Sequence, residues 1–287
     1  MRAVTADKRL PALLALAVPV LVGAAWMALA GAPSHYPLVN LGALLLIAPW
    51  LFLAVAPHTR TSRVLVVVVM IAIMMAAIIV GPKAVSITGH PVYRWFPLGP
   101  LALNTGALAV PLLALVAARN AGMASPVILA GTAIALLQPD AATGLALTFA
   151  AIGIHHVTRD WRVGVAAIIA FVASLVMAMR GELPPQPFVE QVLIDSARQS
   201  VALAVALALA LVASFCLILF ATRFEKVVRF ALAGALLGFA MMALMSSYPA
   251  PLIGYGPSAI LGLGLALGVA GARNAQGQAM QDDQKTA

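Results

Sequence analysis

Three acidic side chains are the strongest candidates for chemistry in this 287-residue chain, which contains only nine aspartates and glutamates. Glu190 and Asp195 lie within the polar stretch Arg180–Gln199, which also contains Glu182, and the third candidate, Asp140, follows a Gln-Pro pair. An ionised carboxylate beside a cleft can act as a general base towards a hydroxyl group. These acids are therefore the candidate site, and the rest of the chain must supply the elements that hold them.

The composition indicates a membrane protein. Hydrophobic residues make up 63% of the chain and charged residues 9%, with a mean hydropathy of +1.04. A soluble domain needs far more surface charge than this, whereas a lipid-facing surface needs none. The net charge of +8 comes from scattered Lys and Arg, without a basic run interleaved with aromatic residues, so nucleic-acid binding is not expected. The sequence predicts an all-α polytopic bundle.

Ten apolar runs predict ten transmembrane helices, because each approaches the length that spans ~30 Å of hydrocarbon. With the N-terminus inside, thirteen of the 17 Lys and Arg residues fall on the cytoplasmic side and four fall outside, which predicts that both termini are cytoplasmic. Residues 1–273 form one transmembrane domain, and the polar tail 274–287 is predicted to be disordered. The runs are Leu10–Gly31, Leu38–Ala56, Arg63–Gly81, Leu101–Ala118, Ser125–Gln138, Ala141–Val157, Val163–Met179, Ser200–Ala221, Val228–Ser246 and Ser258–Ala272.

The polar residues gather on the outer side of this predicted topology. Three long connections face outward, Gly81–Pro100, Arg180–Gln199 and Ser247–Pro257, together with the short turn Gln138–Ala141. ATP is not available there, and the chain has no glycine-rich phosphate loop of the nucleotide type. The energy for any reaction must therefore come with the substrate.

Each acid has a structural alternative to a catalytic role. Asp140 precedes a helical run and can simply cap it, with Thr143 beside it. Pro187 predicts a short interfacial helix over Phe188–Gln199, with Glu190 in its first turn, where the helix dipole favours an ionised side chain. On that helix Asp195 can form an i,i+3 ion pair with Arg198, which is the favoured interpretation of Asp195.

Three outer segments resemble one known family in order and position. Arg94–Gly99 (RWFPLG) is similar to an RW-x-x-LG run before the fourth span. Leu137–Thr143 (LQPDAAT) is similar to an L-Q-P-D-L-G-T motif, and Pro249–Ser258 (PAPLIGYGPS) to a P-L-P-F-I-S-Y-G-G-S run before the last span. The family is that of the SEDS proteins (shape, elongation, division and sporulation), which include FtsW and RodA. The resemblance implies a ten-span glycosyltransferase that polymerises lipid II into peptidoglycan.

Two departures from the family pattern bear on activity. Ala107 and Val110 stand where the family has a Glu and a Lys in its central cavity. Because both the Glu and the Lys are absent, neither charge is left buried without its partner. In the outer loop after the seventh span, the family has L-P-E-x-H-T-D with a proposed catalytic Asp. Counting from Leu183 places Val189 at that position, and Glu190 follows one residue later.

The resemblance implies a reaction on an undecaprenyl-pyrophosphate-linked sugar outside the bacterial cytoplasmic membrane. Glu190 is the expected base, with Asp195 and Asp140 as alternatives. Arg94, Arg180 or Arg198, with or without a divalent cation, would stabilise the pyrophosphate. A single-span transpeptidase of the penicillin-binding class is the implied partner. A non-catalytic membrane scaffold and a lipid-carrier translocase stay open as alternatives. The other expected substrate-binding residues are Trp95, Gln138, Thr143, Tyr255 and Ser258.

Overall fold

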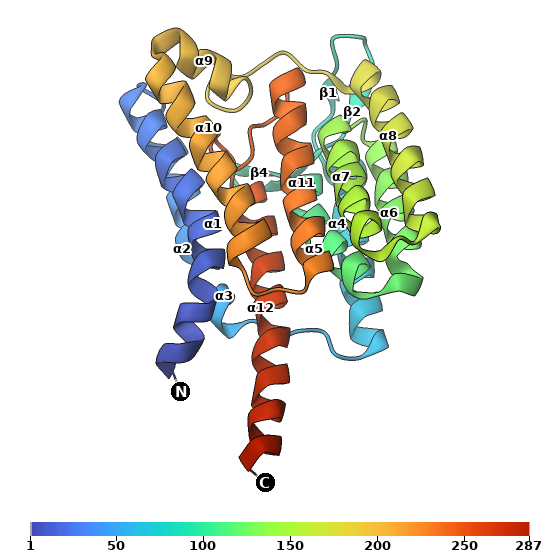
Figure 1. The fold of residues 1–287 in the computed structure, drawn as a ribbon. Helices are drawn as coiled ribbons and strands as arrows, with labels where there is room; N and C mark the ends of the chain where they lie inside the picture. The colour runs from blue at the N-terminus through green and yellow to red at the C-terminus, as the bar shows by residue number, and fades with distance from the viewer. Residues whose placement is uncertain (1, 287) are drawn as a thin grey trace.

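The apolar runs fold as helices, the form in which a chain satisfies its backbone polar groups inside a bilayer (Figure 1). The computed structural model describes the backbone of residues 2–286 and the side chains of residues 9–272. Within that part, seven helical spans are long and apolar enough to cross a membrane, and three shorter apolar helices complete the predicted ten. The chain is thus a multi-pass membrane protein, and the predicted helical bundle is confirmed.

The helix boundaries follow the predicted spans closely. The second span is a helix followed by a short one, and the eighth ends in a π-helical turn, Leu217–Ala221. The backbone of residues 274–286 belongs to the last helix, whereas the side chains of 274–287 lie outside the described residues; the predicted disorder of this tail stays a prediction. The helices are α1 (Arg2–Leu29), α2 (His35–Ile47), α3 (Trp50–Leu53), α4 (Arg60–Val80), α5 (Thr105–Arg119), α6 (Ala121–Leu137), α7 (Ala141–Thr158), α8 (Trp161–Gly181), α9 (Val192–Gln199), α10 (Val201–Cys216), α11 (Lys226–Met245) and α12 (Pro257–Thr286).

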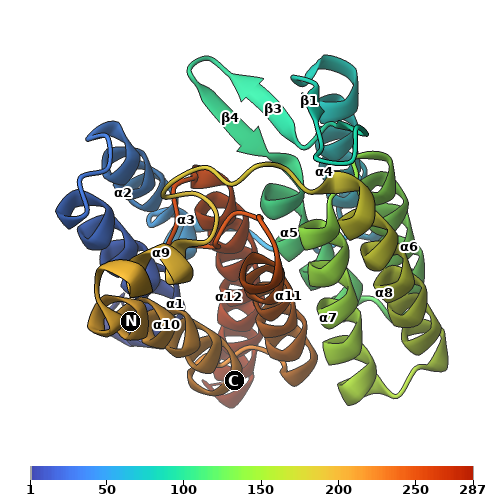
Figure 2. The ribbon, with the colours of Figure 1, turned by 90° about the horizontal axis from the view of Figure 1, so that it is seen from above.

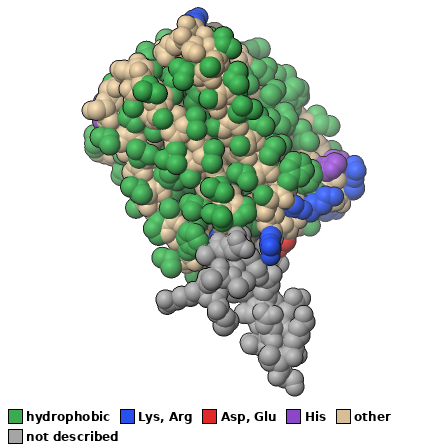
Figure 3. Space-filling model, turned by 60° about the vertical axis from the view of Figure 1, so that its left-hand side comes forward, with side chains coloured by type: hydrophobic (Ala, Val, Ile, Leu, Met, Phe, Trp, Pro, Cys, Tyr) green, Lys and Arg blue, Asp and Glu red, His purple; other side chains and the backbone are tan. Residues whose placement is uncertain are grey.

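The two ends of the bundle differ in character. The start of α1 and the far end of α12 lie at the same end of the molecule, as an even number of spans requires (Figure 1). Figure 3 shows a face that is largely hydrophobic along its height, with Lys and Arg gathered towards that same end. We call this the inner end and the opposite one the outer end. The positive-inside pattern predicts that the inner end faces the cytoplasm.

Two small hairpins build the outer connection between α4 and α5. Strand β1 (Ala84–Val85) pairs with β2 (Pro91–Val92), and β3 (Trp95–Leu98) pairs antiparallel with β4 (Leu101–Asn104). The expected helical span Leu101–Ala118 is therefore wrong at its start, because residues 101–104 form a strand. The Asn104 side chain accepts a hydrogen bond from the backbone N–H of Ala107 (2.8 Å) and so begins α5 at Thr105.

The predicted interfacial helix starts later than expected, at Val192. Phe188 and Gln191 have left-handed φ angles of 66° and 54°, which a helix does not accept. The carbonyl of Phe188 instead accepts a hydrogen bond from the N–H of Tyr255 (2.7 Å). The expectation that Glu190 lies in a first helical turn is therefore wrong, since residues 188–190 form backbone hydrogen bonds and a β-bridge with the loop before α12.

Helices α7 and α11 pack closely at the centre of the bundle. Gly234 and Gly238 on α11 face the main chain of α7 around Phe149 and Ala146, so that a Cβ atom at either glycine would clash with backbone. The four-residue spacing of these small residues is what permits such an approach. This contact sets the position of the outer end of α7, which begins at the candidate site.

Replacing Gly238 with alanine is expected to force α7 and α11 apart. The new Cβ would lie 2.5 Å from the Cα atom of Ala146, well inside contact distance. Overpacking of this kind costs about 1–3 kcal/mol, so the thermal unfolding midpoint in detergent should fall. Gly122→Ala is the control, because nothing lies within 4 Å of that Cβ position. Equal midpoints for the two variants would contradict the close packing described here.

Candidate functional site at the outer end

A cavity of about 300 Å³ opens at the outer end of the bundle. Its walls come from the β3–β4 hairpin, the start of α5, the loop between α8 and α9, and the segment that leads into α12. Seen from above, the chain between α8 and α9 crosses from one side of the bundle to the other (Figure 2). The described lining contains no charged side chain, and its polar or amphipathic members are Trp95, Asn104, Gln186, Tyr255 and Ser258.

Three of the expected substrate-binding residues lie in this cavity, namely Trp95, Tyr255 and Ser258. The Ser258 hydroxyl accepts a hydrogen bond from the N–H of Asn104 (2.8 Å), which ties α12 to the β3–β4 hairpin. The Tyr255 ring stacks on Tyr36 of α2 at 3.8 Å between centroids. Aromatic faces and neutral hydrogen-bonding groups of this kind suit a saccharide or another neutral polar ligand.

Glu190 lies directly behind the wall of the cavity. Its main chain forms an isolated antiparallel bridge with Pro249, and its Oε2 atom accepts a hydrogen bond from the N–H of Gln186 (2.8 Å). Both neighbours line the cavity, whereas Glu190 itself is only 7% exposed. The carboxylate therefore faces neither lipid nor bulk water, and it lies behind the residues that line the cavity.

Burial raises the pKa of Glu190 to about 7. The hydrogen bond from Gln186 and the positive charge of Arg94 both act in the opposite direction, but they are smaller than the cost of taking the charge out of water. A carboxyl group with such a pKa is poised to accept a proton near neutral pH, which is the property that a general base needs.

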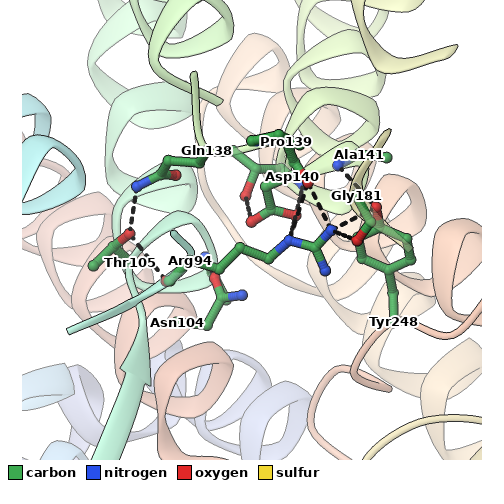
Figure 4. A network of polar contacts seen from close by, with 11 residues as sticks. Arg94, Asn104, Thr105, Gln138, Pro139, Asp140, Ala141, Gly181 and Tyr248 are labelled. Atoms are coloured by element: carbon green, nitrogen blue, oxygen red, sulfur yellow. Dashed lines mark hydrogen bonds and ion pairs between the residues drawn. The ribbon is translucent and has the colours of Figure 1, made fainter. Parts of the chain in front are cut away.

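The centre of the polar network is the Arg94 side chain, which is 1% exposed (Figure 4). Its Nε and Nη2 atoms donate to the carbonyl oxygen of Pro139, at 3.1 and 2.6 Å, and Nη2 also donates to the carbonyl of Gly181. The same Nη2 donates to the Tyr248 hydroxyl (2.9 Å), and the guanidinium lies over that ring. Arg94 thus joins the α6–α7 turn, the end of α8 and the loop after α11.

This geometry does not support the expectation that Arg94 binds pyrophosphate. Its bonds are to protein carbonyls and a buried tyrosine, and it is not among the residues that line the cavity. It also lies 3.9 Å from Asp140, measured from Nε to Oδ1, and this pair is fully buried. We assign Arg94 the role of a positioning residue that fixes the outer ends of the helices around the site.

Asp140 caps the start of helix α7, which is one of the two roles expected for it. Its Oδ1 atom accepts a hydrogen bond from the N–H of Thr143 (3.3 Å), and Oδ2 accepts one from the Thr143 hydroxyl (2.8 Å). Both residues are completely buried and neither lines the cavity. The structure therefore does not place Thr143 where a substrate could reach it, and the Asp140 carboxylate is engaged by the cap and by Arg94.

Gln138 is likewise buried rather than open to substrate. Its Nε2 atom donates to the carbonyl of Met74 (2.7 Å) and to the hydroxyl of Thr105 (3.1 Å), so it connects α4 and α5 to the α6–α7 turn. The side chain has no exposed surface. Gln138 therefore does not line the cavity, and its hydrogen bonds join helices instead.

The other expected charged residues lie on the surface. Arg198 forms the predicted i,i+3 ion pair with Asp195 at 3.1 Å on α9. Arg180 is exposed at the end of α8. None of the three lines the cavity. The favoured structural interpretation of Asp195 is therefore present in the fold, and a pyrophosphate contact by Arg180 or Arg198 would lie outside the cavity.

Several residues at the site could not be singled out from the sequence. Gln186 and Asn104 line the cavity, and Tyr248 contacts Arg94. Neither the types of these residues nor their spacing in the sequence indicates that they lie at the site. Ala107 does line the cavity, and it stands at the position of the family's Glu, while Val110 is fully buried in α5. The outward cavity therefore has no charged side chain at the position where the resemblance implies a Glu.

The described residues offer no protein site for the divalent cation that was considered. No group of three or more His, Cys, Asp and Glu side chains among them is arranged to hold a metal ion. Glu190, the carboxylate that adjoins the cavity, would supply one ligand at most. A divalent cation at this site stays a prediction.

The fold and the site define a polytopic helical membrane protein with an outward cavity that is bordered by the loops after α8 and α11. The solved structure of the rod shape determining protein RodA from Thermus thermophilus matches with a TM-score of 0.62 and 18% identity, over 92% of this chain and 95% of that one. An aspartate-to-alanine mutant of the same protein matches with a TM-score of 0.64 and 18% identity, over 92% and 96% of the two chains. No model of a known protein family matches the sequence, and no curated protein does. The fold implied by the sequence resemblance is confirmed.

Proposed function

We propose that this protein is a divergent SEDS-type glycosyltransferase that acts on a polyprenyl-pyrophosphate-linked sugar at the outer face of the bacterial cytoplasmic membrane. One observation carries the proposal. A buried carboxylate with a pKa of about 7, Glu190, adjoins the outward cavity, in the loop where the family keeps its proposed catalytic acid. The RodA-like fold and the apolar lateral surface support a lipid-linked substrate.

In the proposed step, Glu190 accepts the proton of an acceptor sugar hydroxyl. The hydroxyl oxygen then forms a bond to the anomeric carbon of the donor sugar, and the bond from that carbon to the pyrophosphate oxygen breaks. The polyprenyl pyrophosphate leaves with the electron pair of the broken bond. The donor's own pyrophosphate ester thus supplies the energy, as a reaction outside the cytoplasm requires.

The cavity wall suits the sugar portion of this substrate. Tyr255 and Trp95 present aromatic surface, and Ser258 and Asn104 present neutral polar groups. The pyrophosphate would lie beyond the cavity, towards the lipid, where the exposed Arg180 and Arg198 remain candidate contacts. A single-span transpeptidase of the penicillin-binding class, in cell elongation or division, remains the proposed partner.

A second candidate function is a non-catalytic scaffold for the cell-wall machinery. The uncharged cavity favours it, because Ala107 stands in the lining where the family has an acid, and no Lys or Arg is among the described residues that line the cavity. The two functions differ in one outcome. Purified protein, with and without its partner, should polymerise a lipid-linked disaccharide if the chain is an enzyme, and it should not if the chain is a scaffold.

The rate of that polymerisation should depend on pH through Glu190. A base must be deprotonated to act, and the raised pKa puts half of the Glu190 carboxyls in the protonated form near pH 7. We expect the initial rate to fall about tenfold per pH unit below pH 7 and to level off above it. Initial rates measured from about pH 5 to about pH 9 test this. A rate that stays constant from about pH 9 down to about pH 5 would contradict a general base with this raised pKa.

A further inference from the structure

Helix α2 carries a buried amide, Asn40, in its second turn. The helix lies at the side of the bundle towards which the chain between α8 and α9 crosses (Figure 2). The Asn40 side chain has no exposed surface, although most of the helix around it is apolar. Taking an amide out of water costs free energy unless its hydrogen bonds are made inside the protein. The partners of Asn40 therefore indicate its role.

Both functional groups of Asn40 bind the same turn in the loop before α12. The Nδ2 atom donates to the carbonyl of Gly254 (2.8 Å), and the Oδ1 atom accepts a hydrogen bond from the N–H of Gly256 (3.0 Å). A backbone carbonyl only accepts and a backbone N–H only donates, so an amide side chain suits this pair of partners. The two bonds hold Tyr255, the residue between the glycines, from both sides.

The same face of α2 also packs against the Tyr255 ring. Tyr36 lies four residues before Asn40, so the two side chains are neighbours on the helix surface. The Tyr36 and Tyr255 rings are stacked, with 7° between their planes. His35 meets both rings edge-on, at 4.8 and 6.2 Å between centroids. Tyr255 is thus held through its backbone and its ring, and it still lines the outward cavity.

On its other side, this turn contacts the segment that carries Glu190. The N–H of Tyr255 donates to the carbonyl of Phe188 (2.7 Å), two residues before Glu190. Glu190 itself forms its β-bridge with Pro249, in the same loop as Tyr255. The turn is therefore bonded to α2 on one side and to the segment of the candidate base on the other. Its position sets where the Tyr255 ring lies relative to the Glu190 carboxylate.

We propose that Asn40 and Tyr36 are positioning residues, which orient Tyr255 as the surface on which a saccharide stacks in the outward cavity. This inference rests on the proposed function for the class of ligand, a neutral sugar. Asn40 acts through the backbone of the turn, and Tyr36 acts through the ring. A sugar on Tyr255 meets Glu190 productively only while the turn keeps its place, because a displacement of about 1 Å can lower a rate strongly.

The test measures two quantities for the full chain in nanodiscs, with a short-chain, water-soluble lipid-linked disaccharide as the probe. These are the equilibrium Kd of the probe and the kcat of its polymerisation. Asn40→Leu keeps the approximate size of the side chain and removes both hydrogen bonds to the turn. We expect the Kd to rise about tenfold and the kcat to fall, because the turn also contacts the Glu190 segment.

A pair of variants at Tyr36 tests the contact with the ring separately. Tyr36→Leu removes the stacked ring and should also raise the Kd about tenfold. Tyr36→Phe keeps the stacked ring and should recover most of the affinity that Tyr36→Leu loses. If Asn40→Leu does not fold, this pair still decides the proposal.

Ser214→Ala is the control for a general loss of stability. It removes a buried hydrogen bond from α10 to the carbonyl of Ala15 in α1 (2.6 Å), and Ser214 is not among the residues that line the cavity. This variant should lower the thermal unfolding midpoint and leave the Kd unchanged.

The outcomes separate this inference from the proposed function. A wild type that binds the probe without polymerising it contradicts the enzyme, and the Kd values of the variants still test the role of Asn40 and Tyr36. A wild type that polymerises the probe, with equal Kd values for Tyr36→Leu and Tyr36→Phe, overturns the inference and leaves the enzyme. The inference is also overturned if the wild type does not bind the probe, or if a folded Asn40→Leu variant loses no more affinity than Ser214→Ala.

Discussion

Replacing Arg94 with methionine should lower the free energy of unfolding by about 3–5 kcal/mol, the cost of removing one partner from a buried ion pair. Methionine fills much of the space but leaves the Asp140 carboxylate buried without its cation. The carbonyls of Pro139 and Gly181 and the Tyr248 hydroxyl lose their shared donor in the same step. Denaturant or thermal unfolding in detergent measures the change.

Two further variants separate this effect from a simple loss of charge. Arg180→Met removes an exposed arginine at the same end of the bundle, and we expect a change within about 0.5 kcal/mol. Combining Arg94→Met with Asp140→Asn should recover part of the loss, because asparagine still caps α7 and carries no charge. A cost for Arg94→Met no larger than that for Arg180→Met would show that Arg94 does not hold the outer end together.

The sequence predicts the bundle well because its signal is physical and local. Apolar length and the distribution of Lys and Arg are sufficient for ten spans with both termini at one end. The start of α5 could not be placed this way, since Leu101–Asn104 is as apolar as the helix that follows it. A hairpin depends on its turn and on pairing with Trp95–Leu98, and the hydropathy of the chain does not contain that information.

The site is predicted less completely, for a related reason. A charged or amide side chain near the outer end can line a cavity or join two helices, and the sequence does not distinguish these roles. Arg94, Gln138 and Thr143 prove to be buried in contacts between helices, whereas Trp95 and Ser258 line the cavity. Which of these occurs depends on tertiary contacts such as the Arg94–Pro139 hydrogen bond.

The position of Glu190 shows the limit of counting along a loop. A count of residues places Val189 at the position of the family's acid and Glu190 one step later. In the fold, Val189 directs its carbonyl to the N–H of Ala250 (2.9 Å), and Glu190 is the buried residue beside Gln186. The one-residue offset therefore does not remove a carboxylate from the neighbourhood of the cavity.

Glu190→Gln should reduce glycan polymerisation by about 10²–10⁴-fold, the usual contribution of a general base. The glutamine has nearly the same shape and can still accept the hydrogen bond from Gln186, so its folding should be unaffected. Glu182→Gln is the matched control, because that acid lies in the same loop and accepts a hydrogen bond from Ser246 without lining the cavity. Its activity should match that of the wild type.

The most direct measurement is therefore the rate at which the purified wild-type protein and its Glu190→Gln variant extend a lipid-linked disaccharide, alone and with the single-span partner. The account predicts an active wild type, an active Glu182→Gln control and a folded but inactive Glu190→Gln protein. Full activity of the Glu190→Gln variant would contradict the assignment of the base. A folded wild type that is inactive under every condition would contradict the enzyme itself and leave the scaffold as the function.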